Sequence, residues 1–164
     1  MKTHVTGGAA LFKKIVLIIL CLACMASITY FSSQDAQEST KLSENVTEKI
    51  ISQSKQYQKL DSAEQKKAVK KENDKVRNLA HFSLFLVLGI LVYSALNEFF
   101  TTKTILIALS FCILYALFDE TYQKLLNNGR AFEWADILKD SLGAVTGIAL
   151  VFVKNLAVKK LICR

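Results

Sequence analysis

The chain has 164 residues, of which 52% are hydrophobic, and it carries a formal net charge of +7. The hydrophobic residues are gathered in long blocks, which excludes an ordinary soluble domain. Lys and Arg number 21 against 14 Asp and Glu, but no nucleic-acid-binding motif accompanies them. We therefore expect membrane lipids, and no nucleic acid, as the partners of this positive charge.

Four apolar blocks predict four transmembrane helices, because a spanning helix needs about 20 apolar residues. The expected spans cover about residues 15–31, 79–96, 102–118 and 137–153. The first block resembles a signal peptide, but its apolar run continues to Phe31, so we interpret it as a retained helix. The sequence therefore predicts an all-α integral membrane bundle over residues 15–153.

Basic residues at both ends of the chain predict the orientation of this bundle. The two tails, residues 1–14 and 154–164, each carry several lysines. Under the positive-inside rule, both tails are expected in the cytoplasm. Residues 32–78 would then be extracytoplasmic, although they are also rich in lysine.

Part of this extracytoplasmic segment has the pattern of a surface helix. Residues 39–75 contain no Gly and no Pro, and Leu42, Val46 and Ile50 recur every four residues. This spacing predicts an amphipathic segment that lies on the membrane surface between the first and second spans. A solvated loop is the alternative interpretation.

Polar residues follow the third apolar block, at the edge of the bilayer, where charged groups are costly. Asp119 and Gln123 are four residues apart, and Glu120 and Gln123 are three apart. On a helix these spacings bring side chains to one face, so both acids are expected to converge on the glutamine.

An acidic stripe opens the fourth block. Asp136, Asp140, Gly143 and Gly147 are spaced four, three and four residues apart, so they share one helix face. Gly143 and Gly147 are expected to let a neighbouring helix approach closely. The acids on the same face should then point into the bundle.

With both termini in the cytoplasm, these polar groups would share the outer end of the bundle. The candidate site consists of His81, Asp119, Glu120, Gln123, Arg130, Asp136, Asp140 and Gln34. One interpretation is an internal network in which Arg130 pairs with Glu120 and Asp136. A second is a binding site for an amphiphile or a phosphate-bearing envelope component. A third is catalysis or metal binding by His81 with nearby carboxylates.

Two sequence patterns bear on metals and cofactors. Cys21-x-x-Cys24 has metal or redox spacing, but it lies in the middle of an apolar block and is interpreted as small apolar filler. No spacing as specific as His-Glu-x-x-His is present. The sequence therefore predicts no bound metal and no cofactor.

The order of the polar and small residues resembles that of a known family. The matching elements are Phe31-Ser32-Ser33-Gln34, His81-Phe82, Leu88-Gly89, Asp119-Glu120-x-x-Gln123, Gly129-Arg130, Asp136, Asp140, Gly143 and Gly147. They are similar to the VanZ-like family over about residues 11–153. The resemblance implies a small multi-pass protein of the bacterial plasma membrane, in a family whose founding member lowers susceptibility to teicoplanin and has no established biochemical mechanism.

Three functional hypotheses follow from the residues and the resemblance. The first is a cell-envelope protein that lowers susceptibility to lipoglycopeptides such as teicoplanin by binding a lipid-linked envelope component or the lipoglycopeptide. The second is a membrane-embedded hydrolase or transferase acting on a lipid or cell-wall precursor. The third is a structural assembly partner that uses Gly143 and Gly147 for helix packing. The sequence leaves open whether the protein is an enzyme, and it indicates no oligomeric state.

Overall fold

The computed structural model describes residues 4–34, 36–98, 103–126 and 132–162. Five α-helices and one short 3-10 helix account for nearly all of them, and these residues include no strand. The helices are α1 (His4–Ser33), α2 (Ala36–Ile51), α3 (Ser62–Asn97), α4 (Thr104–Leu125) and α5 (Trp134–Ile162). The prediction of an all-α protein is confirmed.

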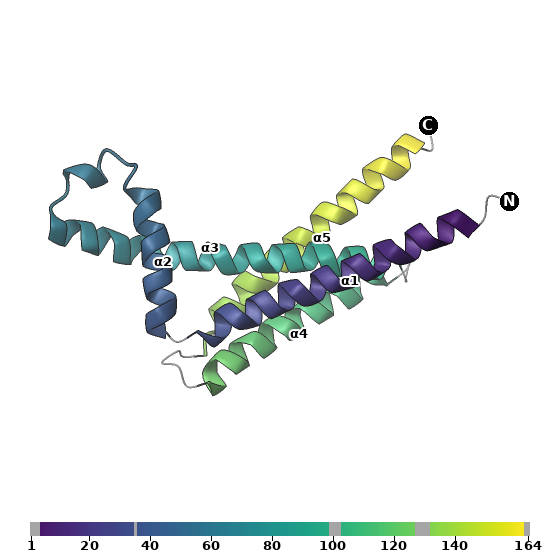
Figure 1. Cartoon of the computed structure of the whole chain (residues 1–164), viewed down its shortest axis with the longest axis horizontal. Coiled ribbons are helices and arrows are strands. Elements are labelled where there is room, and N and C mark those ends of the chain that lie inside the picture. The colour runs from purple at the N-terminus through teal and green to yellow at the C-terminus, as the bar shows by residue number, and fades with distance from the viewer. Residues whose placement is uncertain (1–3, 35, 99–102, 127–131, 163–164) are drawn as a thin grey trace.

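Four of these helices, α1, α3, α4 and α5, are long and apolar enough to cross a membrane. Their outward faces expose large apolar side chains, among them Leu22, Leu114 and Leu138. Such a broad exposed apolar surface is expected where a protein contacts lipid. The two ends of the chain lie at the same end of the bundle (Figure 1), as an even number of spans requires. The prediction of four spanning helices is confirmed.

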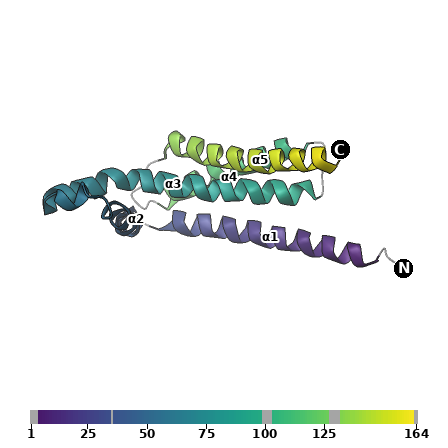
Figure 2. The same ribbon diagram turned by 90° about the horizontal axis from the view of Figure 1, so that it is seen from above.

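Helix α3 is the centre of the bundle, because it contacts each of the other four helices. Figure 2 shows α3 between α1 on one side and α5 on the other. Phe85 and Leu88 of α3 are completely buried in the core that these helices share. The buried face of α4 is built from small residues, Ala108, Cys112 and Ala116, which recur every four positions and let the helices pack closely.

Glycines set the close approach of α3 and α5. A Cβ atom added at Gly143 would overlap the carbonyl oxygen of Phe82, and one added at Gly147 would overlap that of Leu86. From the other side, a Cβ at Gly89 would lie 2.9 Å from the Cα atom of Ala144. The small-residue stripe on α5 therefore packs against the backbone of α3, which is the arrangement expected for such a stripe.

Helix α3 begins well before the apolar block that was expected to define it. Asp61 caps its N-terminus by accepting hydrogen bonds from the amides of Ala63 and Glu64, and the Glu64 side chain accepts one from the Asp61 amide. This capping box satisfies amides that would otherwise lack partners. With 36 residues, α3 is about 54 Å long, whereas the hydrocarbon core of a bilayer is about 30 Å thick. The helix therefore projects beyond the bilayer, and much of the segment before residue 79 is continuous with the second span.

Helix α2 lies across the projecting part of α3 (Figure 1). The buried side chain of Thr47 donates a hydrogen bond to Oδ1 of Asn73 on α3 at 3.3 Å. The predicted apolar stripe of Leu42, Val46 and Ile50 falls on α2, and all three side chains remain exposed. This is the amphipathic helix expected between the first two spans, with an apolar face open to a membrane surface.

Candidate functional site

A buried hydrogen-bond network joins α1 to α4 at the end of the bundle opposite the chain termini. Asp119 of α4 is only 1% exposed. Its Oδ2 atom accepts hydrogen bonds from Ser32 Oγ at 2.8 Å and from Gln123 Nε2 at 2.9 Å. The Gln123 amide also reaches Ser32 Oγ at 3.2 Å. Of the two acids that were predicted to converge on Gln123, Asp119 forms a hydrogen bond with it, and Ser32 is a further member of the network.

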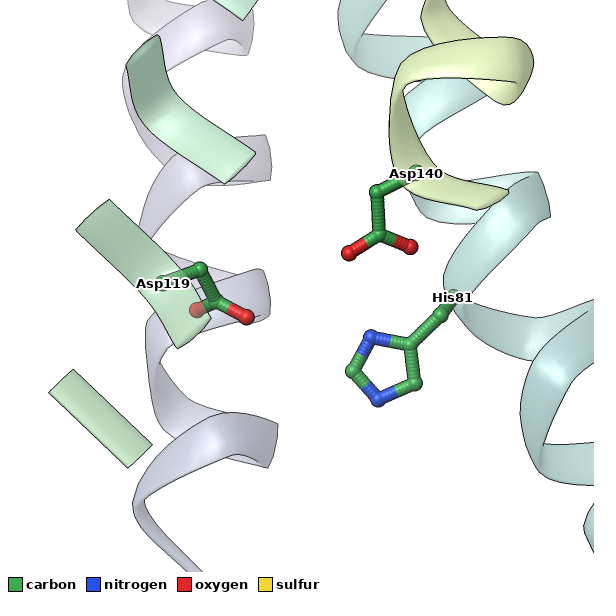
Figure 3. Close-up of side chains that lie close together, drawn as sticks. All are labelled: His81, Asp119 and Asp140. Carbon is green, nitrogen blue, oxygen red and sulfur yellow. The ribbon is translucent and has the colours of Figure 1, made fainter. Parts of the chain in front are cut away.

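Three side chains of the kinds that bind metal ions come from three different helices and converge beside this network. His81 comes from α3, Asp119 from α4 and Asp140 from α5, and Figure 3 shows their side chains pointing toward one another. One nitrogen or carboxylate oxygen from each residue lies within 4.8 Å of the other two. Asp140 is 5% exposed, and its Oδ1 atom has no hydrogen-bond partner among the described residues. Gly143, one turn after Asp140 on α5, packs against the backbone of Phe82 on α3. Because Phe82 directly follows His81, this close contact brings Asp140 near His81.

The other two acids of the predicted site, Glu120 and Asp136, interact with residues at or next to the start of α5. Glu120 is buried and accepts a hydrogen bond from the backbone amide of Glu133 at 2.6 Å. Asp136 forms an ion pair with Lys139 at 2.7 Å. Lys139 also donates to Asn78 of α3 at 3.1 Å, so it joins α5 to α3. The predicted pairing of these acids with Arg130 cannot be compared, because Arg130 lies outside the described residues.

A hydrophilic cavity of about 320 Å³, here called the polar pocket, lies at this end of the bundle. Its lining consists of Asp74, Arg77, Asn78, His81, Gln123, Glu133, Asp136, Lys139 and Asp140. Four of these side chains are carboxylates and two, Arg77 and Lys139, are basic. The described lining therefore has an excess of two negative charges when all four acids are ionised.

A second cavity, here called the apolar groove, adjoins the polar pocket and has a volume of about 310 Å³. Its lining consists of Phe31, Gln34, Leu42, Ser43, Val46, Val76, Arg77, Ala80, His81 and Leu84, from the end of α1, from α2 and from α3. Arg77 and His81 line both cavities. Gln34, which was expected with the acids, lies in the apolar groove instead.

Several residues that line the polar pocket were not predicted, among them Arg77 and Lys139, and Ser32 was not among the predicted site residues. A sequence pattern exists for Arg77, because Asp74, Arg77 and His81 are spaced by three and four residues and so share one helical face. That pattern is informative only if the helix begins before residue 74, as α3 does. The role of Ser32 depends on how α1 meets α4, which the sequence does not specify.

The fold and this polar end define a class: small all-α membrane proteins with four spanning helices and a buried polar layer at one end of the bundle. A family model described as VanZ/LLP1 matches residues 17–155, most of the chain. The chain belongs to this family, which confirms the resemblance noted in its sequence. No curated protein and no solved structure matches it.

Proposed function

We propose that this VanZ-like protein acts at the bacterial cell envelope by binding an amphiphile whose polar head carries a phosphate. One observation carries the proposal: a polar pocket and an apolar groove lie side by side and share Arg77 and His81. A molecule with an apolar tail and a polar head is the ligand that fills both. Each cavity has a volume at the lower end of the range for small-molecule sites.

The apolar groove is suited to a hydrocarbon chain. Leu42 and Val46 of α2 form one side of it, and Leu84 of α3 forms part of the other. Burying a hydrocarbon chain against these side chains removes apolar surface from water, which is favourable at about 25 cal/mol per Å². Since Leu42 and Val46 also lie on the exposed apolar face of α2, the groove is accessible to a lipid from the membrane surface.

The cations of the polar pocket are suited to the head group. Arg77 forms no ion pair with any other described residue, so its guanidinium group is available to a ligand. A guanidinium group binds phosphate oxygens through two parallel hydrogen bonds. Lys139 also lines the pocket and adds a second positive charge, which Asp136 partly neutralises.

The predicted orientation of the bundle supports a role for this site at the cell envelope. The start of α1 and the end of α5 lie at one end of the bundle (Figure 1), whereas the polar pocket is lined by Asp136 and Asp140 near the opposite end of α5, its start. The basic tails favour a cytoplasmic location for the termini, so the pocket is proposed to open at the outer face of the plasma membrane. A protein that binds a lipid-linked envelope component there would alter the access of lipoglycopeptides such as teicoplanin to the cell surface.

Lipid retention is the direct test of ligand binding. Purified wild-type protein is expected to retain a phosphate-bearing lipid that mass spectrometry detects, and Arg77→Gln is expected to lose most of it. Lys75→Gln is the matched control, because Lys75 is an exposed cation on the same helix that pairs with Glu72 outside the pocket. Equal lipid retention by wild type and Arg77→Gln would contradict the proposal.

Teicoplanin susceptibility tests the cellular consequence. A host that expresses the wild-type protein is expected to be less susceptible than one that expresses Arg77→Gln or Glu120→Gln, with membrane levels matched. Glu120 is included because its carboxylate positions the start of α5 through the Glu133 amide. Identical susceptibility with and without the wild-type protein would separate this chain from the resistance role.

A further inference from the structure

We propose that His81, Asp119 and Asp140 together bind one divalent transition-metal cation, such as Mn²⁺ or Zn²⁺, at the edge of the polar pocket, which His81 and Asp140 line. This inference goes beyond the proposed lipid site and does not depend on it. The three residues come from α3, α4 and α5, so the site exists only in the folded bundle. This explains why no metal-binding spacing is visible in the sequence.

The donor set and its geometry fit a single ion. An imidazole nitrogen and carboxylate oxygens are ligands of both Zn²⁺ and Mn²⁺. With metal–ligand distances of about 2.0–2.2 Å, two ligands of one ion lie no more than roughly 4.4 Å apart. The three donor atoms already lie within 4.8 Å of one another (Figure 3), so small side-chain rotations bring them into the required range.

Asp140 provides an independent reason to expect a cation. Its side chain is 95% buried, points at His81 and Asp119, and leaves Oδ1 without a hydrogen-bond partner among the described residues. A buried carboxylate oxygen without a partner is costly, and buried charges are normally paired or coordinate metals. A metal ion between the three side chains removes this cost.

The surroundings support the same conclusion. Ser32 and Gln123 donate hydrogen bonds to Asp119 Oδ2, which holds this carboxylate in place as outer-shell groups do around metal ligands. Among the described residues, the lining of the polar pocket has four acidic and two cationic side chains, so a divalent ion would offset the excess negative charge of the ionised acids. Three protein ligands also leave coordination positions on the ion for water or for an anionic oxygen.

Metal content is the first test. The full chain is purified with a tag that contains no histidine and without chelators, and its metals are measured by plasma mass spectrometry. Wild type is expected to contain about one transition-metal ion per chain, His81→Ala almost none, and Asp140→Asn at least tenfold less than wild type. Asp136→Asn is the matched control and is expected to keep the metal, because Asp136 lies one turn away on α5 and is not part of the group of three. Metal loss in Asp136→Asn equal to that in Asp140→Asn would overturn the assignment.

Rebinding makes the test independent of how well the variants fold. Wild-type protein stripped with a chelator is titrated with Mn²⁺, and bound Mn²⁺ is followed by electron paramagnetic resonance, with Zn²⁺ as competitor. One saturable site that Zn²⁺ displaces supports the proposal. Metal-free wild type that also binds no Mn²⁺ and no Zn²⁺ overturns it. Lipid retention is measured on the same samples, so an absent metal with normal lipid overturns the metal site alone, and a bound metal with no lipid supports it and overturns the lipid site.

Discussion

Replacing Gly147 by alanine should weaken the contact between α3 and α5. The added methyl group would overlap the backbone carbonyl oxygen of Leu86 and lie 3.0 Å from the backbone nitrogen of Ile90. Both atoms belong to the helix backbone, so no side-chain rotation relieves the overlap. Helix α5 must therefore retreat from α3 by roughly 1 Å, which is the overpacking that costs about 1–3 kcal/mol in protein cores.

The net effect is smaller than the packing cost because alanine favours helices. Gly→Ala in a helix interior contributes up to about 1 kcal/mol through intrinsic helix propensity. Because the added methyl group meets backbone atoms that cannot rotate away, we take the packing cost as about 2–3 kcal/mol, so the expected net loss for Gly147→Ala is about 1–2 kcal/mol. For a chain of this size, 1 kcal/mol corresponds to about 2–4 °C in Tm, so we expect a decrease of about 2–8 °C.

Thermal unfolding in detergent can be followed with a dye that fluoresces when it reacts with thiols. Cys112 is buried and free, and Cys21 and Cys24 are partly buried and free, so they react when the bundle opens. All proteins carry Cys163→Ser, so that the signal comes from these three cysteines.

Gly8→Ala provides the control, because a Cβ atom at Gly8 meets nothing within 4 Å. This variant makes the same chemical change within a helix without a steric conflict, so its Tm is expected to equal or slightly exceed that of wild type. A Tm of Gly147→Ala that matches the Gly8→Ala value would refute the close packing of α5 on the backbone of α3.

Two further variants test other parts of the structure. Ser32→Ala removes a hydroxyl donor from the buried carboxylate of Asp119 and should lower stability by about 1–3 kcal/mol, measured as a decrease in Tm by the same dye assay. Ser83→Ala removes only a hydroxyl that is exposed and bonded within its own helix, and should leave Tm nearly unchanged; equal Tm values for both variants would count against the network. Asp61→Ala removes the cap of α3 and should cost about 1 kcal/mol, with faster hydrogen exchange of the first-turn amides. Unchanged exchange of those amides would show that Asp61 does not cap the helix.

The spanning helices were predictable because their signal is local. A long apolar run specifies a membrane helix without reference to the rest of the chain, and four such runs correspond to α1, α3, α4 and α5. The beginning of α3 was missed because hydropathy changes near residue 79, whereas the helix continues through polar residues that also favour helices. The Asp61 and Glu64 pair was the available signal for the true start.

The candidate site was only partly predictable because it depends on how helices cross. Asp119 and Gln123 lie on one helix, so their spacing was sufficient to predict their contact. His81 and Asp140 come together only because glycines let α3 and α5 approach, and the sequence does not specify which residues face each other across that contact. The contribution of Ser32 likewise required knowledge of how α1 packs on α4.

Because α3 is continuous from Ser62 to Asn97, its membrane-embedded and projecting parts form a single helix. The chain contains no proline, so no proline kink interrupts this helix. Helix α2 contacts the projecting part of α3 through the hydrogen bond between Thr47 and Asn73, and His81 lies farther along α3. One uninterrupted helix therefore joins the contact with α2 to His81 in the polar pocket. We expect a molecule that binds only to α2 at the membrane surface to influence the polar pocket through this helix, without entering the pocket.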